Sequence, residues 1–443
     1  MRRRPTRRSV LKGGAAGTVA LCLPGVLAGR PPSAHALSEP ATEPPEPNPF
    51  TVRFGVDKAM LARVLGVAMG RGGDFADLFF EHTLKRGFGL EDGIVNVAWT
   101  RVDLGVGIRV VVGDQTGYAY TEDLTEEAMR GAAATAAAIA DSGAVAPPVA
   151  FDYPHFPHHY PVYVPFSGVD AADKVVILEQ LDRRAHARDP RIVKASVSYD
   201  DSESWVMIAD SDGRIATDYR PMAYASMVCT AESGDERQSN FANMSARQGF
   251  EFFSSERMDR MADLAVDRTV TLFDAVRPPG GELPVVLAPG SSGILLHEAI
   301  GHGLEADFNR KEVSIFSSMV GQKVAEPIVT VVDDATNPGV RGSLNVDDEG
   351  NRTECTTLVE DGVLTGYLHD RISAAHYGVA PTGNGRRQSF RHVPQPRMRN
   401  TYMLPGPHTP DEIIASVDLG IYAETFTNGQ VQIGAGDFTF YIK

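Results

Sequence analysis

The residues in this sequence whose types and spacing best suit chemistry lie in the segment LLHEAIGHGLEAD, residues 295–307. They are His297, Glu298 and His302, in that order. Imidazole nitrogens are good ligands for a divalent transition metal, and a neighbouring carboxylate can act as a general base. In the familiar zinc helix H-E-x-x-H, two histidines four residues apart share one face. Here the second histidine comes one residue later.

This spacing places a demand on the backbone. Five steps along a regular α-helix rotate a side chain by about 140° beyond a full turn, so the two imidazoles would point apart. A π-helical bulge absorbs one extra residue, and such bulges gather at functional sites. Gly301 precedes the second histidine, where a distortion costs least. We therefore predict a locally widened or ending helix; the alternative is a chance arrangement on a solvated helix.

The sequence before the motif indicates how it is positioned. Residues 283–288 read as a buried strand, and a Pro/Gly/Ser turn follows. Ser291 or Ser292 is suited to cap the next helix. A strand, a tight turn and a helix that begins near its reactive residues would place the chemistry at the edge of a sheet.

Several separated segments resemble one known family. HEAIGHGLEAD is similar to the signature of the TldD/PmbA family of metalloproteases, also called modulators of DNA gyrase. The resemblance covers most of residues 53–443, and the motifs occur in the family's order. The segments that share it are GVGIRVVVGDQTGYAYTEDLT (105–125), GSLNVDDEGNRTECTTLVEDGVLTGYLHDR (342–371), GNGRRQSFRHVPQPRMRNTYMLPG (383–406) and TNGQVQIGAGDFTF (427–440). The HExxxH motif marks the TldD-like, metal-bearing branch, because the sister PmbA-like subunits lack it.

The resemblance implies a metallopeptidase that hydrolyses unfolded or flexible peptides. It implies one divalent transition metal, with zinc expected, held by His297 and His302, and Glu298 as the catalytic base. Asp307, the last residue of the motif, would orient a ligand or, as an alternative, bind the metal itself. Glu305 is expected at the surface. Family members often act as dimers, so a homodimer or a heterodimer with a PmbA-like sister subunit is expected.

One feature of the family pattern is missing from the sequence. The family's third ligand is expected to be a cysteine in a glycine-rich segment beyond TNGQ…GDF, and no cysteine follows Cys355. We therefore expect an incomplete C-terminal domain; Cys355 does not match the ligand position. The competing interpretation is a non-catalytic assembly subunit derived from the enzyme.

The N-terminus has the pattern of an export signal. A basic start, an apolar stretch near residues 15–28 and the site Ala34-His35-Ala36 outline a leader over residues 1–36. Arg7 and Arg8 form the pair typical of the twin-arginine route, which predicts a periplasmic or other extracytoplasmic location. The apolar stretch is short and broken by Pro24, which argues against a stable membrane anchor.

The charge of the chain argues against nucleic acid as a partner. The formal net charge is −15. The leader holds seven of the 42 basic residues and no acidic residue, so its removal would leave 35 basic against 57 acidic residues, a net charge of −22. Such a body repels phosphates. Cys229 and Cys355 could pair in an oxidising compartment, but two unpaired thiols packed as small hydrophobes are the simpler expectation.

The order of predicted elements indicates an α+β fold. We expect a disordered Pro/Glu-rich linker over 37–52, an N-terminal domain over 53–145, a central domain over 146–277 and a C-terminal domain over 278–443. The first two would mix helices with antiparallel strands, including hairpins at Asp92-Gly93 and Asp212-Gly213. The last would be mostly β, with one helix that bears the motif.

Other polar clusters are weaker candidates. His155, His158 and His159 lie in a proline-broken linker without a fixed scaffold, so we interpret them as structural. The acidic turn 347–349 could bind calcium, but a solvated turn is the simpler interpretation. Residues 384–387 (NGRR) would bind a substrate backbone or shape a loop.

Overall fold

The computed structural model describes residues 48–140, 150–290 and 293–442 of the 443-residue chain. The predicted leader and residues 37–47 of the predicted linker lie outside these ranges, as do Ser291 and Ser292. The linker prediction is wrong for its last residues, because Pro49–Val52 form a short helix, α2. The ring of Phe50 is buried there, 5.4 Å from the ring of Phe80.

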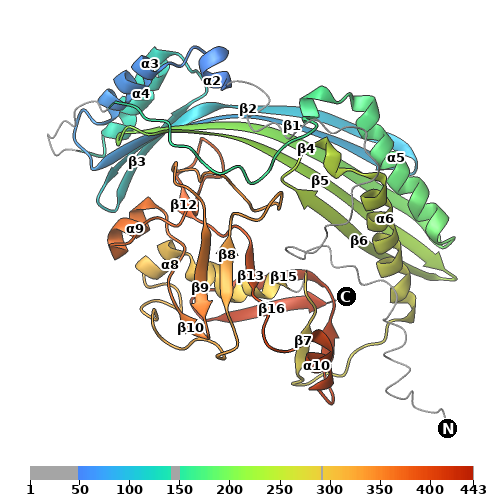
Figure 1. The fold of residues 1–443 in the computed structure, drawn as a ribbon. Helices are drawn as coiled ribbons and strands as arrows, with labels where there is room; N and C mark the ends of the chain where they lie inside the picture. The colour runs from blue at the N-terminus through green and yellow to red at the C-terminus, as the bar shows by residue number, and fades with distance from the viewer. Residues whose placement is uncertain (1–47, 141–149, 291–292, 443) are drawn as a thin grey trace, which may run out of the picture.

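One six-stranded antiparallel sheet forms the body of the molecule (Figure 1). Its order is β3-β2-β1-β4-β5-β6. Pairing of β1 with β4, from Asp77 opposite Asp210 to Glu91 opposite Ser196, joins the predicted N-terminal and central domains in the same sheet. The strands are β1 (Phe75–Glu91), β2 (Ile94–Val112), β3 (Gln115–Thr121), β4 (Ile192–Asp210), β5 (Ile215–Ser233) and β6 (Glu236–Ala246).

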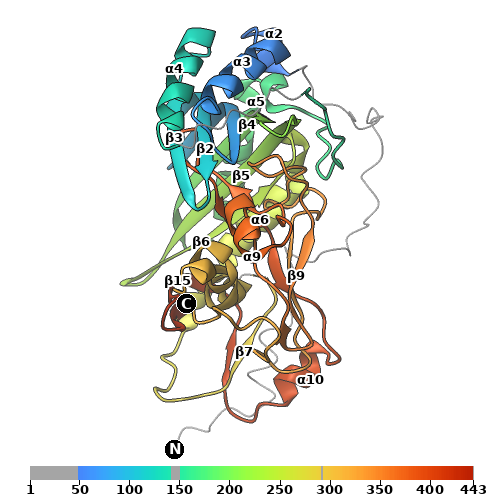
Figure 2. The same cartoon turned by 90° about the vertical axis from the view of Figure 1, so that its left-hand side faces the viewer.

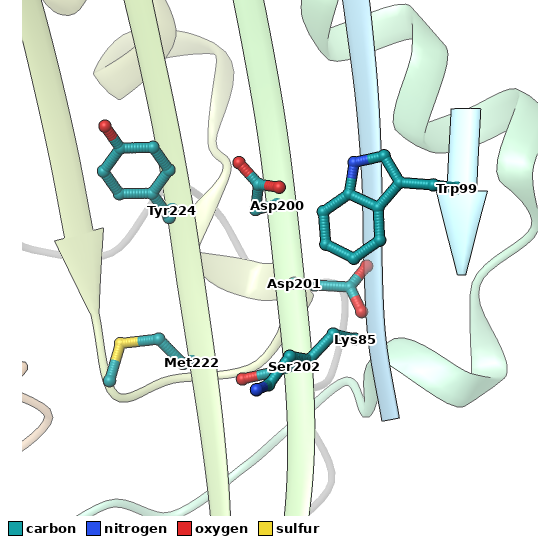
Figure 3. Close-up of a pocket in the computed structure, with 7 residues that line it drawn as sticks. All are labelled: Lys85, Trp99, Asp200, Asp201, Ser202, Met222 and Tyr224. Carbon is teal, nitrogen blue, oxygen red and sulfur yellow. The ribbon is translucent and has the colours of Figure 1, made fainter. Parts of the chain in front are cut away.

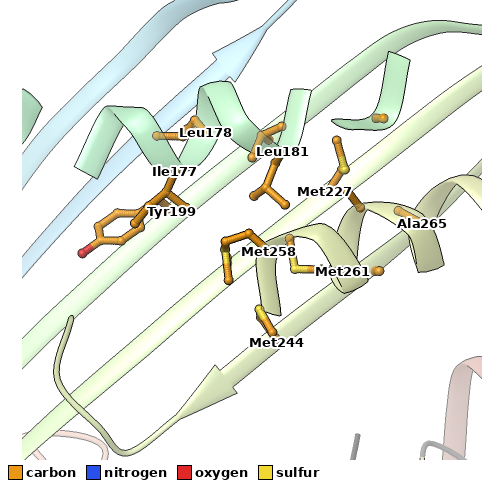
Figure 4. Packing of buried hydrophobic residues seen from close by; sticks show 14 of the residues in the cluster. Ile177, Leu178, Leu181, Tyr199, Met227, Met244, Met258, Met261 and Ala265 are labelled. Atoms are coloured by element: carbon orange, nitrogen blue, oxygen red, sulfur yellow. The ribbon is translucent and has the colours of Figure 1, made fainter. Parts of the chain in front are cut away.

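Helices cover one face of this sheet. Alternate side chains of β4 point to that face, so Val197 and Tyr199 pack under α5 and α6 while Met207 and Ala209 pack in the core with α3 and α4 (Figure 4). Helix α4 begins after Thr125, whose side chain accepts a hydrogen bond from the Ala128 amide. The helices are α3 (Lys58–Ala68), α4 (Glu126–Ala137), α5 (Ala171–Arg188) and α6 (Ser255–Val270).

The C-terminal region lies against the opposite face of the sheet (Figures 1 and 2). Val206 and Ile208, the alternate residues of β4, share a buried cluster with Val346 and Phe390. Because both faces of the sheet are covered there, its middle is a core for the whole molecule.

The acidic turn 347–349 is part of this contact and is not solvated. Asp348 lies 2.5 Å from a guanidinium nitrogen of Arg220, and Glu349 lies 2.7 Å from one of Arg109. Asp347 accepts hydrogen bonds from the backbone amides of Glu349 and Asn351. The prediction of a solvated turn is therefore wrong. The carboxylates that calcium would need are instead paired with arginines or hydrogen-bonded to backbone amides.

The C-terminal region is built from short elements. β8 and β9 form the middle of a four-stranded sheet ordered β10-β9-β8-β13, and three two-stranded pairs lie beside it: β11-β12, β14-β7 and β15-β16. Short helices accompany the predicted motif helix. The strands are β7 (Val285–Leu287), β8 (Val331–Asp334), β9 (Cys355–Glu360), β10 (Val363–Leu364), β11 (Gly385–Arg386), β12 (Gln395–Pro396), β13 (Thr401–Met403), β14 (Ile421–Ala423), β15 (Phe426–Gln432) and β16 (Asp437–Ile442); the helices are α7 (Ile294–Leu296), α8 (Ala306–Arg310), α9 (Arg371–Tyr377) and α10 (Pro410–Ala415).

Two further expectations need correction. The strand before the motif, β7, is not buried, since Val285 is 50% exposed and β7 pairs only with β14, in parallel. The histidine-bearing linker has a scaffold: the His159 amide donates to the Asn345 side chain, and the Tyr160 hydroxyl donates to Asp218. Within the described ranges, no helix is both long enough and apolar enough to cross a membrane.

Candidate metal centre

The motif segment contains the predicted π-helical distortion. After α7, residues His297–Gly301 form a π-helical turn, η5, and His302–Leu304 form a 3-10 turn, η6. The wider turn compensates for the extra residue between the histidines. As a result the two imidazole rings lie 4.6 Å apart between centroids, at 79° to each other. The prediction of a locally widened helix is confirmed.

The three motif residues form one cluster. One ligand atom each from His297, Glu298 and His302 lies within 4.8 Å of the others. Among the residues that the structure describes, these three form the cluster of histidine, cysteine and carboxylate side chains that could hold a metal ion. His297 is exposed, while Glu298 and His302 are half-buried. Two imidazoles and a carboxylate facing one point are the donor set that a divalent transition metal such as zinc prefers, so the residues fit the metal.

A carboxylate orients the second histidine, but it is not the one predicted. Nδ1 of His302 lies 3.0 Å from Oε2 of Glu305, which leaves the other ring nitrogen for a metal. Glu305 is fully buried, contrary to its expected place at the surface. Asp307 contacts Arg397 at 3.6 Å, and Arg397 in turn donates to Glu305 at 3.3 Å. Asp307 therefore acts on His302 only through two intervening side chains.

Backbone contacts fix the end of the motif. The Leu368 amide donates to the Leu304 carbonyl, and the Ala306 amide donates to the Leu368 carbonyl. The side chains of Asn309 and Ser314 both donate to the Gly303 carbonyl. These bonds satisfy backbone groups that the ending helix leaves without partners.

Gly301 is required by close packing rather than by its dihedral angles. Its backbone is right-handed helical, but a Cβ at this position would overlap the sulfur of Met398. The absence of a side chain therefore lets the π-helical turn lie directly against Met398, whose side chain is buried.

The surroundings of the two histidines shift their pKa values in opposite directions. Although part of the His297 side chain is exposed, partial desolvation of its ring, and secondly the neighbouring His302, lower the pKa of His297, which favours the neutral ring that a metal needs. The hydrogen bond that His302 donates to the Glu305 carboxylate raises the pKa of His302. Burial raises the pKa of Glu305 itself, against the opposing effects of His302 and Arg397.

Other sequence candidates do not join this cluster. Cys355 is exposed as a residue, but partial desolvation of its thiol, and secondly the neighbouring Asp334, raise the pKa of the thiol to about 11. Cys229 is buried in the central core, so both thiols are unpaired as expected, although only Cys229 is packed. In the NGRR segment, Asn384 donates to Asp333 and Arg387 donates to Asp77, both buried. This segment shapes a contact within the molecule.

Comparison with known proteins places this geometry in a family. Family models match three consecutive parts of the chain: PmbA/TldA metallopeptidase domain 1 at residues 76–140, the central domain at 164–273 and the C-terminal domain at 280–443. A metalloprotease TldD homolog of Haemophilus influenzae is 39% identical over 387 residues, which cover 86% of this chain and 80% of that protein. The chain belongs to the PmbA/TldD family. Its relatives are named metalloproteases, and the chain is accordingly a TldD-like metallopeptidase.

Two further matches extend the comparison. TldE from Thermococcus kodakarensis shares the fold, with a TM-score of 0.69 at 19% identity over 86% of each chain. A zinc metalloprotease TldD homolog of Saccharolobus solfataricus is 29% identical over 270 residues, which cover 59% of this chain and 60% of that protein. The family resemblance predicted from the motifs is confirmed. The roles of Glu305 and Arg397 beside the centre were not predicted. The three-residue interval between His302 and Glu305, about one helical turn, is the signal that could have identified their contact.

Proposed function

We propose that this metallopeptidase hydrolyses peptide bonds of unfolded or flexible peptides at the cluster of His297, Glu298 and His302. The observation that carries the proposal is the π-helical turn, which brings two imidazoles and one carboxylate to the same point despite their unusual spacing. His297 and His302 would hold one divalent metal, with zinc as the expected ion. The Saccharolobus relative, which is named a zinc metalloprotease, supports that choice.

The residues of the cluster divide the chemistry between them. A bound zinc ion supplies a Lewis acid that polarises the scissile carbonyl and makes a water molecule easier to deprotonate. Glu298 accepts the proton of the attacking water and later delivers it to the leaving amine. Glu305 keeps the ring of His302 in one orientation, and Arg397 stabilises the buried charge of Glu305.

The Glu298→Gln variant tests this assignment. It keeps the size and the hydrogen bonds of the side chain but removes the base, so we expect peptide cleavage to fall by about a hundredfold or more. Metal content per chain, measured by elemental analysis, should stay unchanged. Glu312→Gln, on a residue outside the cluster, serves as the matched control. Full cleavage by metal-loaded Glu298→Gln would rule out Glu298 as the base.

A non-catalytic assembly subunit is the alternative function. The same preparation separates the two, because an enzyme should carry about one transition metal per active site and a disabled subunit should carry none. The structural likeness to TldE supports a family partner, and we propose a homodimer or a heterodimer with a PmbA-like subunit.

We also propose export through the twin-arginine route, with the mature protein outside the cytoplasm. The proposal rests on Arg7 and Arg8 ahead of a short apolar stretch. Replacement of both arginines by lysine should retain the precursor in the cytoplasm, as cell fractionation and immunoblotting would show. Normal export and cleavage of the double-lysine precursor would exclude this route.

A further inference from the structure

A small pocket lies on the six-stranded sheet, away from the metal-centre residues (Figure 3). It opens on the face opposite α5 and α6, because its central residue Asp200 alternates along β4 with Tyr199, which packs under those helices. Its volume is about 140 Å³, enough for a small head group. The residues that line it come from four neighbouring strands: Lys85, Trp99, Asp200, Asp201, Ser202, Met222 and Tyr224.

The register of the sheet places two aromatic rings on either side of one carboxylate. Gly87 of β1 lies opposite both Trp99 of β2 and Asp200 of β4, and Asp200 lies opposite Tyr224 of β5. A Cβ on Gly87 would overlap the indole of Trp99, so that ring lies directly over the glycine. Figure 3 shows Asp200 between the indole of Trp99 and the phenol of Tyr224.

The carboxylate of Asp200 is not neutralised. It is half-buried, and within the described ranges no lysine or arginine forms an ion pair or hydrogen bond with it. Burial, and secondly the nearby Asp201, raise the pKa of its carboxyl group. The adjacent Asp201, in contrast, is bound by Arg86 at 2.8 Å and by Lys174 at 2.7 Å.

Three cationic side chains of the protein lie around the pocket, one bound to Asp103 and two beside the aromatic rings of the pocket. Lys85 donates to Asp103 at 3.3 Å. Arg101 lies 5.7 Å from the ring centre of Trp99, and Arg341 lies 6.0 Å from that of Tyr224. Both distances are near the outer limit of a cation–π contact, so each ring has one arginine of the chain at the edge of this range. The face of an aromatic ring attracts a cation.

The geometry points to a binding site for an organic cation, an alkylammonium or guanidinium head group on an apolar stem. The head group would lie between the rings of Trp99 and Tyr224 and pair with Asp200, while its stem would follow Met222. Such a cation satisfies a half-buried carboxylate and two aromatic faces at once. The cation could be a side chain of a bound peptide or a free amine. The first source rests on the proposed function. Binding itself requires no metal.

The first test compares blocked amino acids on the unchanged protein by ligand-observed NMR. N-acetyl-lysine methylamide should bind, and its neutral counterpart N-acetyl-norleucine methylamide should bind about tenfold more weakly, because it has the stem without the charge. Equal affinities, or no binding of the lysine compound, would overturn the proposal. Cadaverine separates the sources: weaker binding than the blocked lysine indicates a peptide side chain, and equal or tighter binding indicates a free amine. None of these outcomes depends on peptidase activity, so failure of this site and failure of the metal centre are distinguishable.

The second test removes the charge. Asp200→Asn should weaken binding of the lysine compound by about tenfold, because the charge-assisted contact is lost. Asp235→Asn makes the same change at an exposed turn between β5 and β6 and should leave the affinity unchanged. Trp99→Leu should weaken binding in the same way. Full affinity in a folded Asp200→Asn protein contradicts the assignment, and the comparison of probes on the unchanged protein stands even if a variant fails to fold.

Discussion

The histidine pair and the carboxylate that orients it show what could be predicted for single residues. His297, Glu298 and His302 were found from sequence because their spacing restricts the backbone to a widened turn. Glu305 was assigned to the surface, because its three-residue interval from His302 indicates at most a contact between the two side chains and gives no sign of burial. Its burial depends on Arg397, 92 residues further along the chain, whose guanidinium donates to it. Sequence reasoning identified the proposed metal ligands and the proposed base, and it missed the carboxylate that orients His302.

The role of Glu305 can be tested by Glu305→Gln, which retains a hydrogen-bonding oxygen but removes the charge next to His302. Loss of such an orienting carboxylate typically weakens metal affinity by about 10- to 100-fold. We expect that loss in zinc competition with a chelator, with the fold retained by circular dichroism. Glu326→Gln, an exposed glutamate, is the control. Unchanged zinc affinity in Glu305→Gln would show that the Glu305 carboxylate does not contribute to metal binding.

Among the elements, turns were predicted well and strand lengths were not. Asp92-Gly93 and Asp212-Gly213 are hairpin turns as predicted, with left-handed φ angles at Asp92, Gly93 and Gly213. The charged stretch 200–203 has the composition of a break between strands, yet β4 runs unbroken from 192 to 210. There Arg86 of β1 binds both Asp201 and Glu203, so these charges neutralise one another within the sheet. Cross-strand pairing of this kind cannot be read from one segment.

The π-helical turn η5 allows a direct test at the same scale. Gly301→Ala places a methyl group where the sulfur of Met398 lies, so we expect a loss of about 1–3 kcal/mol in the free energy of unfolding. Gly293→Ala is the matched control in the same segment, because its new methyl group meets no atom within 4 Å. Urea unfolding of both variants measures the difference. Equal stabilities of the two variants would show that the turn does not depend on this contact.

At the scale of the whole molecule, one sheet joins parts of the chain that were predicted as separate domains. Composition and linkers divide the sequence near residue 146, but pairing of β1 with β4 crosses that boundary. The C-terminal region then binds the sheet through buried charges that looked like surface residues in sequence. Arg387 of the NGRR segment donates to Asp77 at 2.6 Å, and both side chains are fully buried. The α+β class could be predicted from local patterns, whereas this assembly required partners that are hundreds of residues apart.

A double-mutant cycle on Asp77 and Arg387 tests whether this buried pair couples the C-terminal region to the sheet. Asp77→Ala leaves two buried arginines, Arg387 and Arg109, without their shared carboxylate, so we expect it to cost about 3–5 kcal/mol. Arg387→Met added to Asp77→Ala should cost less than the sum of the single changes, because one of the uncompensated charges is removed.

The pair Arg184–Asp263 between α5 and α6 provides the control for this cycle. Its two hydrogen bonds of 2.8 and 2.7 Å are as short, but its side chains are 41% and 25% exposed. Water screens such a pair, so its coupling energy should stay below about 1 kcal/mol. Urea unfolding of both cycles gives the two coupling energies. We expect a larger coupling energy for Asp77 and Arg387, because burial and not hydrogen-bond length sets the strength of an ion pair. Equal coupling energies would mean that apolar contacts, such as those of Phe390, hold the two parts of the molecule together.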